Sequence, residues 1–113
     1  MSLAIRLLPE TVRSVAFGAI SPAYIGIGTA MTRPIRIIMI QNLMDAPLMF
    51  SLDGINDHFP LAANGYLLMD ITANKTLAQG FFLAEGQRVY ASQLNAAPTD
   101  ESVYLTTFYG AEL

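Results

Sequence analysis

The stretch IRIIMIQNLMDAPLMFSLDG, residues 35–54, carries the strongest β-strand signal in the chain. Its first part, residues 35–41, is dominated by β-branched residues, and residues 48–53 form a second apolar run. Between them, residues 42–47 contain the turn formers Asn, Asp and Pro. The stretch therefore predicts two β-strands joined by a tight connection, as in a hairpin.

The first of these predicted strands is apolar on both faces. Alternation places Ile35, Ile37 and Met39 on one face and Ile38 and Ile40 on the other. A strand that is apolar on both faces is usually covered on both faces. Because the chain has only 113 residues, we expect the second cover to come from another chain.

The composition supports this expectation of a partner. A chain of 113 residues has the size of one domain, which buries roughly two thirds of its unfolded surface. Charged residues make up 13% of the chain, where about 25% is usual, and hydrophobic residues make up 53%. Much apolar side chain must therefore lie at the surface, where large apolar patches mark contacts with partners. The composition favours a homo-oligomer or a subunit of a larger assembly.

The charge pattern argues against several other classes of protein. The net charge is −3, and the six basic residues form no stripe that could neutralise phosphates, so no nucleic-acid partner is expected. The chain has no cysteine for a disulfide framework or a thiolate ligand. No run of 18 apolar residues predicts a membrane span, and the apolar run at residues 3–8 is interrupted by Arg6, unlike a signal peptide.

The rest of the chain reads as further short strands punctuated by Gly, Pro, Asn and Asp. No helix of three turns can be drawn. The pattern predicts one all-β domain over residues 1–113, a β-sandwich of the jelly-roll type with about eight short antiparallel strands. Besides the two strands above, the expected strands span residues 14–20, 24–31, 66–72, 81–84, 88–94 and 102–109.

Residues 1–13 fit either a short strand or an extended arm, because Leu3, Ile5 and Leu7 alternate before Pro9 stops the run. In residues 24–31, small residues alternate with Ile25 and Ile27, which suggests close approach of another backbone. Phe108 and Tyr109 point to opposite sides of a strand, so one of these rings faces outward. These patterns give six candidate contact residues: Leu3, Ile5, Leu7, Ile25, Ile27 and Tyr109.

The loop of residues 51–58 is the richest cluster of titratable side chains. Asp53, Asn56 and Asp57 are ligand types for hard cations, but their spacing does not match a twelve-residue calcium loop. The same residue types form ordinary turns. His58 is the only histidine, and on an extended chain its neighbour Asp57 points away from it. We predict no catalytic residue, no metal site and no cofactor, and leave open whether the Asp53-Asp57-His58 loop binds a metal or a glycan.

Two other chemical roles have little support in the sequence. Asp70 and Glu85 both lie near strand ends, where a glycosidase would need a pair of acids, but so do acids in any β-domain. Exposed aromatic rings such as Tyr109 or Phe59 could serve as platforms for sugars, although the chain has no tryptophan. For most of the aromatic residues, packing in the core is the expected role.

The order of these motifs resembles small virion structural proteins of tailed bacteriophages. The resemblance is carried by IRIIMIQNLMDAPLMFSLDGINDHFPL, GYLLMDITANKT, GFFLAEGQRVYASQL and SVYLTTFYG, and it spans residues 14–110. These are packing and turn motifs, and no catalytic residues carry over. The resemblance implies a decoration (cement) protein with a β-sandwich or jelly-roll fold and an arm that reaches neighbouring subunits.

From this resemblance we expect a protein that is made in the host cytoplasm and built into the virion. Its partners would be the major capsid protein and copies of itself, with no membrane and no small-molecule ligand. The N-terminal arm would add a strand to a neighbour. Three alternatives remain: a ring-forming neck or tail subunit, a carbohydrate-binding β-sandwich module, and an enzyme that depends on His58 or Asp57.

Overall fold

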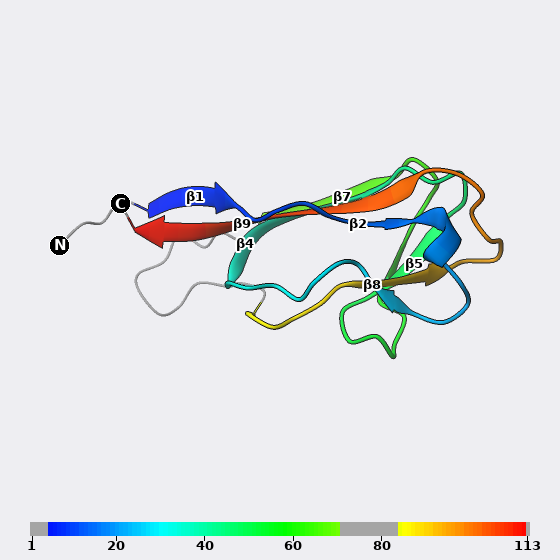
Figure 1. The fold of residues 1–113 in the computed structure, drawn as a ribbon, viewed down its shortest axis with the longest axis horizontal. Helices are drawn as coiled ribbons and strands as arrows, with labels where there is room; N and C mark the ends of the chain where they lie inside the picture. The colour runs from blue at the N-terminus through cyan, green and yellow to red at the C-terminus, as the bar shows by residue number, and fades with distance from the viewer. Residues whose placement is uncertain (1–4, 71–83, 113) are drawn as a thin grey trace.

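A computed structural model describes residues 5–70 and 84–112, with side chains for residues 7–70 and 84–110. The chain forms two antiparallel β-sheets that pack face to face (Figure 1). The predicted all-β sandwich is confirmed. Its elements are β1 (Ile5–Pro9), β2 (Arg13–Ala16), the 3-10 turn η1 (Phe17–Ala19), β3 (Ile25–Gly26), β4 (Ile35–Asn42), β5 (Leu48–Ser51), β6 (Phe59–Leu61), β7 (Tyr66–Asp70), β8 (Tyr90–Gln93) and β9 (Ser102–Glu112).

The two sheets are called sheet A and sheet B. Sheet A has the order β1-β9-β4-β7, and β2 pairs with the same side of β9 as an interrupted continuation of β1. Sheet B has the order β3-β8-β5-β6. Within the described chain, the consecutive strands β5 and β6 both belong to sheet B. By contrast, the connection from β3 to β4 and the connection from β4 to β5 each cross from one sheet to the other.

The predicted hairpin at residues 35–54 is therefore wrong. β4 pairs with β9 and β7, and β5 pairs with β8 and β6, so residues 43–47 cross from one sheet to the other. Met44, in the middle of this crossing, is fully buried. The Asn42 side chain donates to the carbonyls of Ala46 and Ala62, each at 3.1 Å, and its oxygen accepts from Met44 N. An apolar, internally hydrogen-bonded connection can cross between sheets, where a hairpin turn would be polar and exposed.

The register of β4 also corrects the predicted faces. Ile35 pairs with Tyr109 and Ile37 with Phe108, so one extra residue lies between them as a β-bulge. The bulge turns Ile35 toward the interior together with Ile38 and Ile40, and all three are buried. Ile37 and Met39 lie on the opposite side of the sheet, half-buried.

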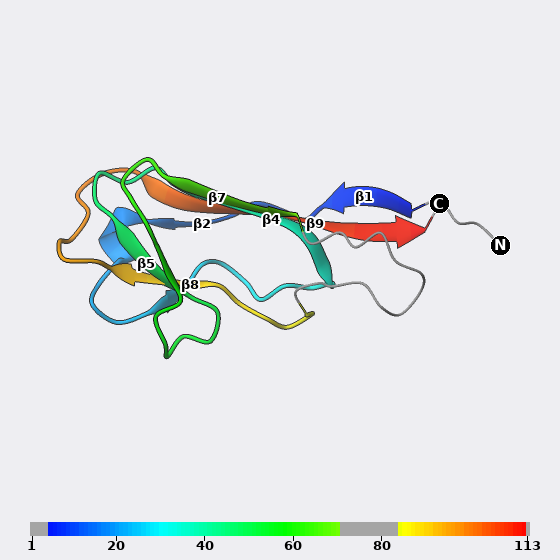
Figure 2. The ribbon, with the colours of Figure 1, turned by 180° about the vertical axis from the view of Figure 1, so that it is seen from behind.

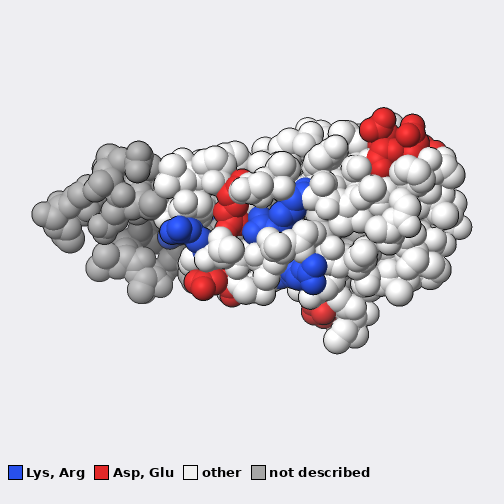
Figure 3. All heavy atoms as spheres, viewed as in Figure 1, with Lys and Arg blue, Asp and Glu red and all other residues white. Residues whose placement is uncertain are grey.

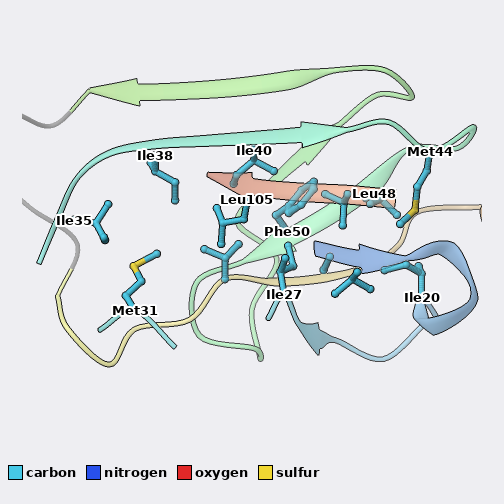
Figure 4. Close-up of a cluster of buried hydrophobic side chains, with 14 residues drawn as sticks. Ile20, Ile27, Met31, Ile35, Ile38, Ile40, Met44, Leu48, Phe50 and Leu105 are labelled. Carbon is cyan, nitrogen blue, oxygen red and sulfur yellow. The ribbon is translucent and has the colours of Figure 1, made fainter. Parts of the chain in front are cut away.

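The core lies between the two sheets (Figure 4). Each large aliphatic side chain there stabilises the fold by roughly 1.5–3 kcal/mol relative to exposure. Phe50 stacks on Phe59 of the neighbouring strand with ring centroids 5.3 Å apart. The buried hydrophobic residues of the cluster are Val15, Ile20, Ile27, Met31, Ile35, Ile38, Ile40, Met44, Leu48, Phe50, Val89, Ala91, Val103 and Leu105.

Two other predicted strands are shorter than expected. In residues 24–31 only β3 is a strand, and the rest is a loop fixed by hydrogen bonds from Ile27 N to Val89 O and from Met31 N to Gln87 O. The predicted strand at residues 14–20 ends at Ala16 because η1 follows. The expected strand at residues 81–84 falls largely outside the described residues, as do Ile71 and Thr72.

β1 and the end of β9 form a two-stranded ribbon, here called the terminal ribbon. Tyr109 is the last β9 residue that pairs with β4, and residues 110–112 pair with β1 alone in the described sheet. The ribbon projects from one end of the sandwich (Figures 1 and 2), and the molecule measures 52 × 24 × 20 Å. In the described part of the chain, no helix has the length and apolar character needed to cross a membrane.

Candidate functional site

The side of sheet A that faces away from sheet B carries a group of neutral residues, here called the outer face. Alternation along β4, β7 and β9 selects its members, because their neighbours in sequence point into the core. The outer face consists of Ile37, Met39, Gln41, Tyr66, Leu68, Tyr104, Thr106 and Phe108.

The strand register arranges these residues in rows across the sheet. Met39 is paired with Leu68 on β7 and with Thr106 on β9, and this row lies at the centre. Gln41 lies between Tyr66 and Tyr104 in the next row. On the other side, Ile37 lies between Phe108 and the acidic Asp70, which marks the corner of the face.

Two members of this face, both on β7, are exposed, and the other six are half-buried. Tyr66 is 68% exposed and Leu68 is 56% exposed, while Leu67 and Met69 on the other side of β7 pack against the core. The sequence predicted one strand that is apolar on both faces, β4, and β7 is a second strand with this property. In Figure 3 the charged side chains gather in a few places, with an acidic group at the end away from β1, and much of the visible surface is neutral.

Other exposed apolar side chains are scattered. Leu7 is 47% exposed on the terminal ribbon, Val12 lies between β1 and β2, and Phe17 lies in η1. Ile55, which is 80% exposed, lies in the loop of residues 51–58 that connects two strands of sheet B. Single exposed apolar residues are normal in soluble proteins, so the outer face, where they are contiguous, is the stronger candidate site.

The loop of residues 51–58 is ordered by its own side chains. The Asp53 carboxylate accepts hydrogen bonds from Ile55 N at 2.8 Å, Asn56 N at 2.9 Å and the Ser51 hydroxyl at 2.8 Å. These donors, the Asn56 backbone first, hold the pKa of Asp53 far below its usual range. A carboxylate used in this way stabilises a turn.

The other polar groups of this loop are engaged separately. His58 Nδ1 accepts a hydrogen bond from Leu52 N at 2.9 Å, and its Nε2 lies 4.0 Å from Asp53 Oδ2. Asp57 instead accepts a hydrogen bond from Tyr24, and burial together with this bond raises the pKa of the Tyr24 hydroxyl. The geometry therefore does not bring Ser51, His58 and Asp57 together as a nucleophile, base and orienting acid.

No group of three or more His, Cys, Asp and Glu residues suited to a metal ion occurs within residues 5–70 and 84–112.

A buried ion pair, which the sequence did not predict, lies at the β1–β2 edge of sheet A, near the terminal ribbon. Arg13 Nη1 lies 2.9 Å from Glu10 Oε1, and both side chains are 6% exposed. Arg13 also donates to Thr29 O at 2.7 Å and to the Thr107 hydroxyl at 3.0 Å. Burial alone would raise the pKa of Glu10, but hydrogen bonds from Thr32, Thr107 and Arg13 outweigh it and lower that pKa. The pair joins the β1–β2 edge of sheet A to the loop before β4.

The six contact residues expected from the sequence have different outcomes. Ile27 is fully buried in the core, so its prediction as a contact residue is wrong. Ile25 and Tyr109 are half-buried and pack against the core, and Arg33 lies over the Tyr109 ring at 4.6 Å. Leu7 is exposed, whereas Leu3 lies outside the described residues and only the backbone of Ile5 is described.

The residues that sequence reasoning missed are those of β7 and the centre of β4. The sequence carries a signal for them, since apolar residues occur on both faces of the predicted strand at residues 66–72. Of the neighbouring rings Phe108 and Tyr109, it is Phe108 that lies on the outer face. The chain matches no family model, no curated protein and no solved structure.

Proposed function

We propose that this chain is a structural subunit of a tailed-phage virion, a decoration protein that stabilises the capsid by bridging neighbouring subunits. The observation that carries the proposal is the outer face: contiguous, neutral and largely apolar, with Leu68 at 56% and Tyr66 at 68% exposure. Such a surface on a small sandwich is typical of a protein that is covered by a partner. The polar loop of residues 51–58 offers no comparable site, because its acids are engaged in turn formation and in a bond to Tyr24.

The strand order supports a jelly-roll assignment within this proposal. Sheet A contains β2-β9-β4-β7 and sheet B contains β3-β8-β5-β6, so eight strands divide equally between the sheets. In both sheets, strands from the start of the chain lie next to strands from its end. Interleaved pairing of this kind is what the two Greek keys of a jelly roll produce, and jelly rolls are common in viral capsid domains.

The terminal ribbon changes the mechanism expected from the sequence. Residues 5–9 are paired with β9 of their own chain, so they are not a free strand that could be donated to a neighbour. The ribbon as a unit can instead reach a neighbouring subunit and present Leu7 and the outer edge of β1. A two-stranded ribbon is marginally stable alone in water, so contact with a neighbour would stabilise it.

Binding to capsids tests the proposal directly. We expect the purified protein to co-sediment with heads of its phage that lack it, and imaging to place it on the capsid surface. Leu68→Glu should abolish co-sedimentation, whereas Ile55→Glu, a charge at a more exposed site off the outer face, should preserve it. A location restricted to the neck or tail would replace the proposal with the ring-subunit alternative, and absence from the virion would reject both.

The carbohydrate-binding alternative has less support. Phe59 stacks on Phe50, and Tyr109 packs against the core beneath Arg33, so neither ring named as a sugar platform is free on both faces. A glycan-array signal for the isolated protein that survives Leu68→Glu would nevertheless favour it over a capsid role.

A further inference from the structure

We infer that His58 is a pH-sensitive switch for the loop of residues 51–58, which holds the start of the loop closed while its ring is neutral and releases it when the ring is protonated. The loop connects two strands of sheet B and lies away from the outer face. The switch and the proposed capsid contact therefore involve different residues and are tested separately.

The hydrogen bond between Leu52 and His58 fixes the form of the ring. Leu52 N donates to His58 Nδ1 at 2.9 Å, so Nδ1 must carry a lone pair. The single N–H of the neutral imidazole is therefore on Nε2, the other ring nitrogen. A protonated ring carries hydrogen on both nitrogens, so that two N–H groups would face each other. The bond to Leu52 can exist only while His58 is neutral.

This bond joins the start of the loop to its end. His58 N donates to Phe50 O at 3.0 Å, and this backbone bond to β5 does not depend on the charge of the ring. Leu52 follows β5 directly, and its side chain packs against the core. The His58 side chain is 38% exposed, so a protonated ring has room to turn toward water and toward Asp53. The Leu52 amide then loses the acceptor that holds it in the closed loop.

The titratable groups near His58 come from its own loop and from the segment before β3, since β5 and β6 contain no charged residue. Asp53 Oδ2 lies 4.0 Å from Nε2, and the lowered pKa of Asp53 keeps this carboxylate ionised near neutral pH. Asp57 accepts a hydrogen bond from Tyr24, whose raised pKa keeps the phenol neutral. Protonation of the ring therefore exchanges a hydrogen bond with Leu52 for an attraction to Asp53.

The middle of the loop has its own support. The Asp53 carboxylate accepts hydrogen bonds from Ile55 N at 2.8 Å and from Asn56 N at 2.9 Å, and neither bond involves His58. We therefore expect a local release at Leu52, with the turn around Asp53 unchanged.

Nuclear magnetic resonance of the full chain between about pH 5 and about pH 8, the range in which histidine ordinarily titrates, tests this inference. We expect the Leu52 amide signal to shift with the same midpoint as the ring protons of His58. The protection of the Leu52 amide against hydrogen exchange should fall by about tenfold or more on the acid side of that midpoint, because its hydrogen bond is lost. The amides of Ile55 and Asn56 should stay protected throughout and serve as controls within the same molecule.

Two variants separate the acceptor from the titration. The amide oxygen of His58→Asn can replace Nδ1 as the acceptor but does not titrate, so the Leu52 amide should stay protected across the whole range. In His58→Ala the same amide should be unprotected at every pH. A wild-type Leu52 amide with equal protection at both ends of the range would overturn the inference. Loss of protection at Ile55 and Asn56 in step with Leu52, or an unchanged midpoint in His58→Asn, would also overturn it.

Discussion

Met39 and Leu68 are direct partners on neighbouring antiparallel strands, and both side chains lie on the outer face of sheet A. Residues paired in this way have Cβ atoms about 4.5–5.5 Å apart and pack against each other. On the same two strands, Ile40 is paired with Leu67 on the inner side, where Ile40 is fully buried. Adjacent residues of β7 therefore have different roles, one in the core and one at the surface.

This difference predicts unequal effects of neighbouring alanine substitutions. Leu68→Ala should lower the free energy of unfolding of the monomer by less than about 1 kcal/mol, because the side chain is already largely exposed. Leu67→Ala should lower it by about 2 kcal/mol, because the side chain packs against the core and its loss leaves a cavity. Urea denaturation at low protein concentration measures both values. Equal losses would mean that the two faces of β7 are not distinguished as described.

Asn42 provides a second prediction, because its buried side chain holds the crossing from β4 to β5. Asn42→Ala should destabilise the fold by about 3 kcal/mol, since the carbonyls of Ala46 and Ala62 lose a donor and Met44 N loses an acceptor. Asn42→Asp should be at least as harmful, because it brings a carboxylate against those carbonyls. Asn56→Ala, in an exposed loop, is the control and should have a smaller effect in the same denaturation experiment. An Asn42→Ala variant as stable as wild type would show that the crossing does not depend on this amide.

Local sequence signals predicted the class of fold and most strand positions, and non-local pairing explains what they missed. β4 was recognised from its β-branched residues, but its partners are β7 and β9, far along the chain, so no local pattern could show that it does not pair with β5. Alternation placed Ile25 and Ile27 on one face, yet it could not show that Ile27 is fully buried in the core cluster that contains Val89. The buried pair of Glu10 and Arg13 has no distinctive spacing, because acid and base three residues apart are common in any sequence.

The outer face could be predicted from the sequence in part, because β4 is apolar on both sides and this predicted a surface that needs a cover.

Gly26 illustrates a close approach that the sequence indicated only in part. The alternation of small residues suggested that another backbone lies near, but the neighbour is the Arg88 side chain, whose Nε donates to Gly28 O at 2.9 Å. A Cβ on Gly26 would lie 2.3 Å from the Arg88 Cζ atom, too close for real contacts. Gly26→Ala should therefore displace the guanidinium and lower the free energy of unfolding by about 1–3 kcal/mol.

Gly18→Ala, where a Cβ meets nothing within 4 Å, is the matched control and should be neutral or slightly stabilising. Thermal unfolding of the two variants side by side measures the difference, and a neutral Gly26→Ala would show that Arg88 moves away freely.

The ion pair of Glu10 and Arg13 predicts how stability changes with pH. The folded protein holds the pKa of Glu10 below its ordinary value through hydrogen bonds from Thr32, Thr107 and Arg13. Between the folded and ordinary pKa values the unfolded chain binds a proton that the folded chain does not, so acid favours unfolding. The contribution of Glu10 is therefore fully present at neutral pH and is lost progressively from about pH 5 downward.

Glu10→Gln removes this titration, so its free energy of unfolding should fall less steeply than that of the wild type as the pH drops below about 5. At pH 7 the variant should be less stable by about 3 kcal/mol, because the Arg13 charge stays buried without its partner. Glu85→Gln, at an exposed turn, is the control and should stay within about 0.5 kcal/mol of wild type at pH 7. Urea denaturation at a series of pH values gives the slopes. Parallel profiles for the wild type and Glu10→Gln would mean that folding does not lower the pKa of Glu10.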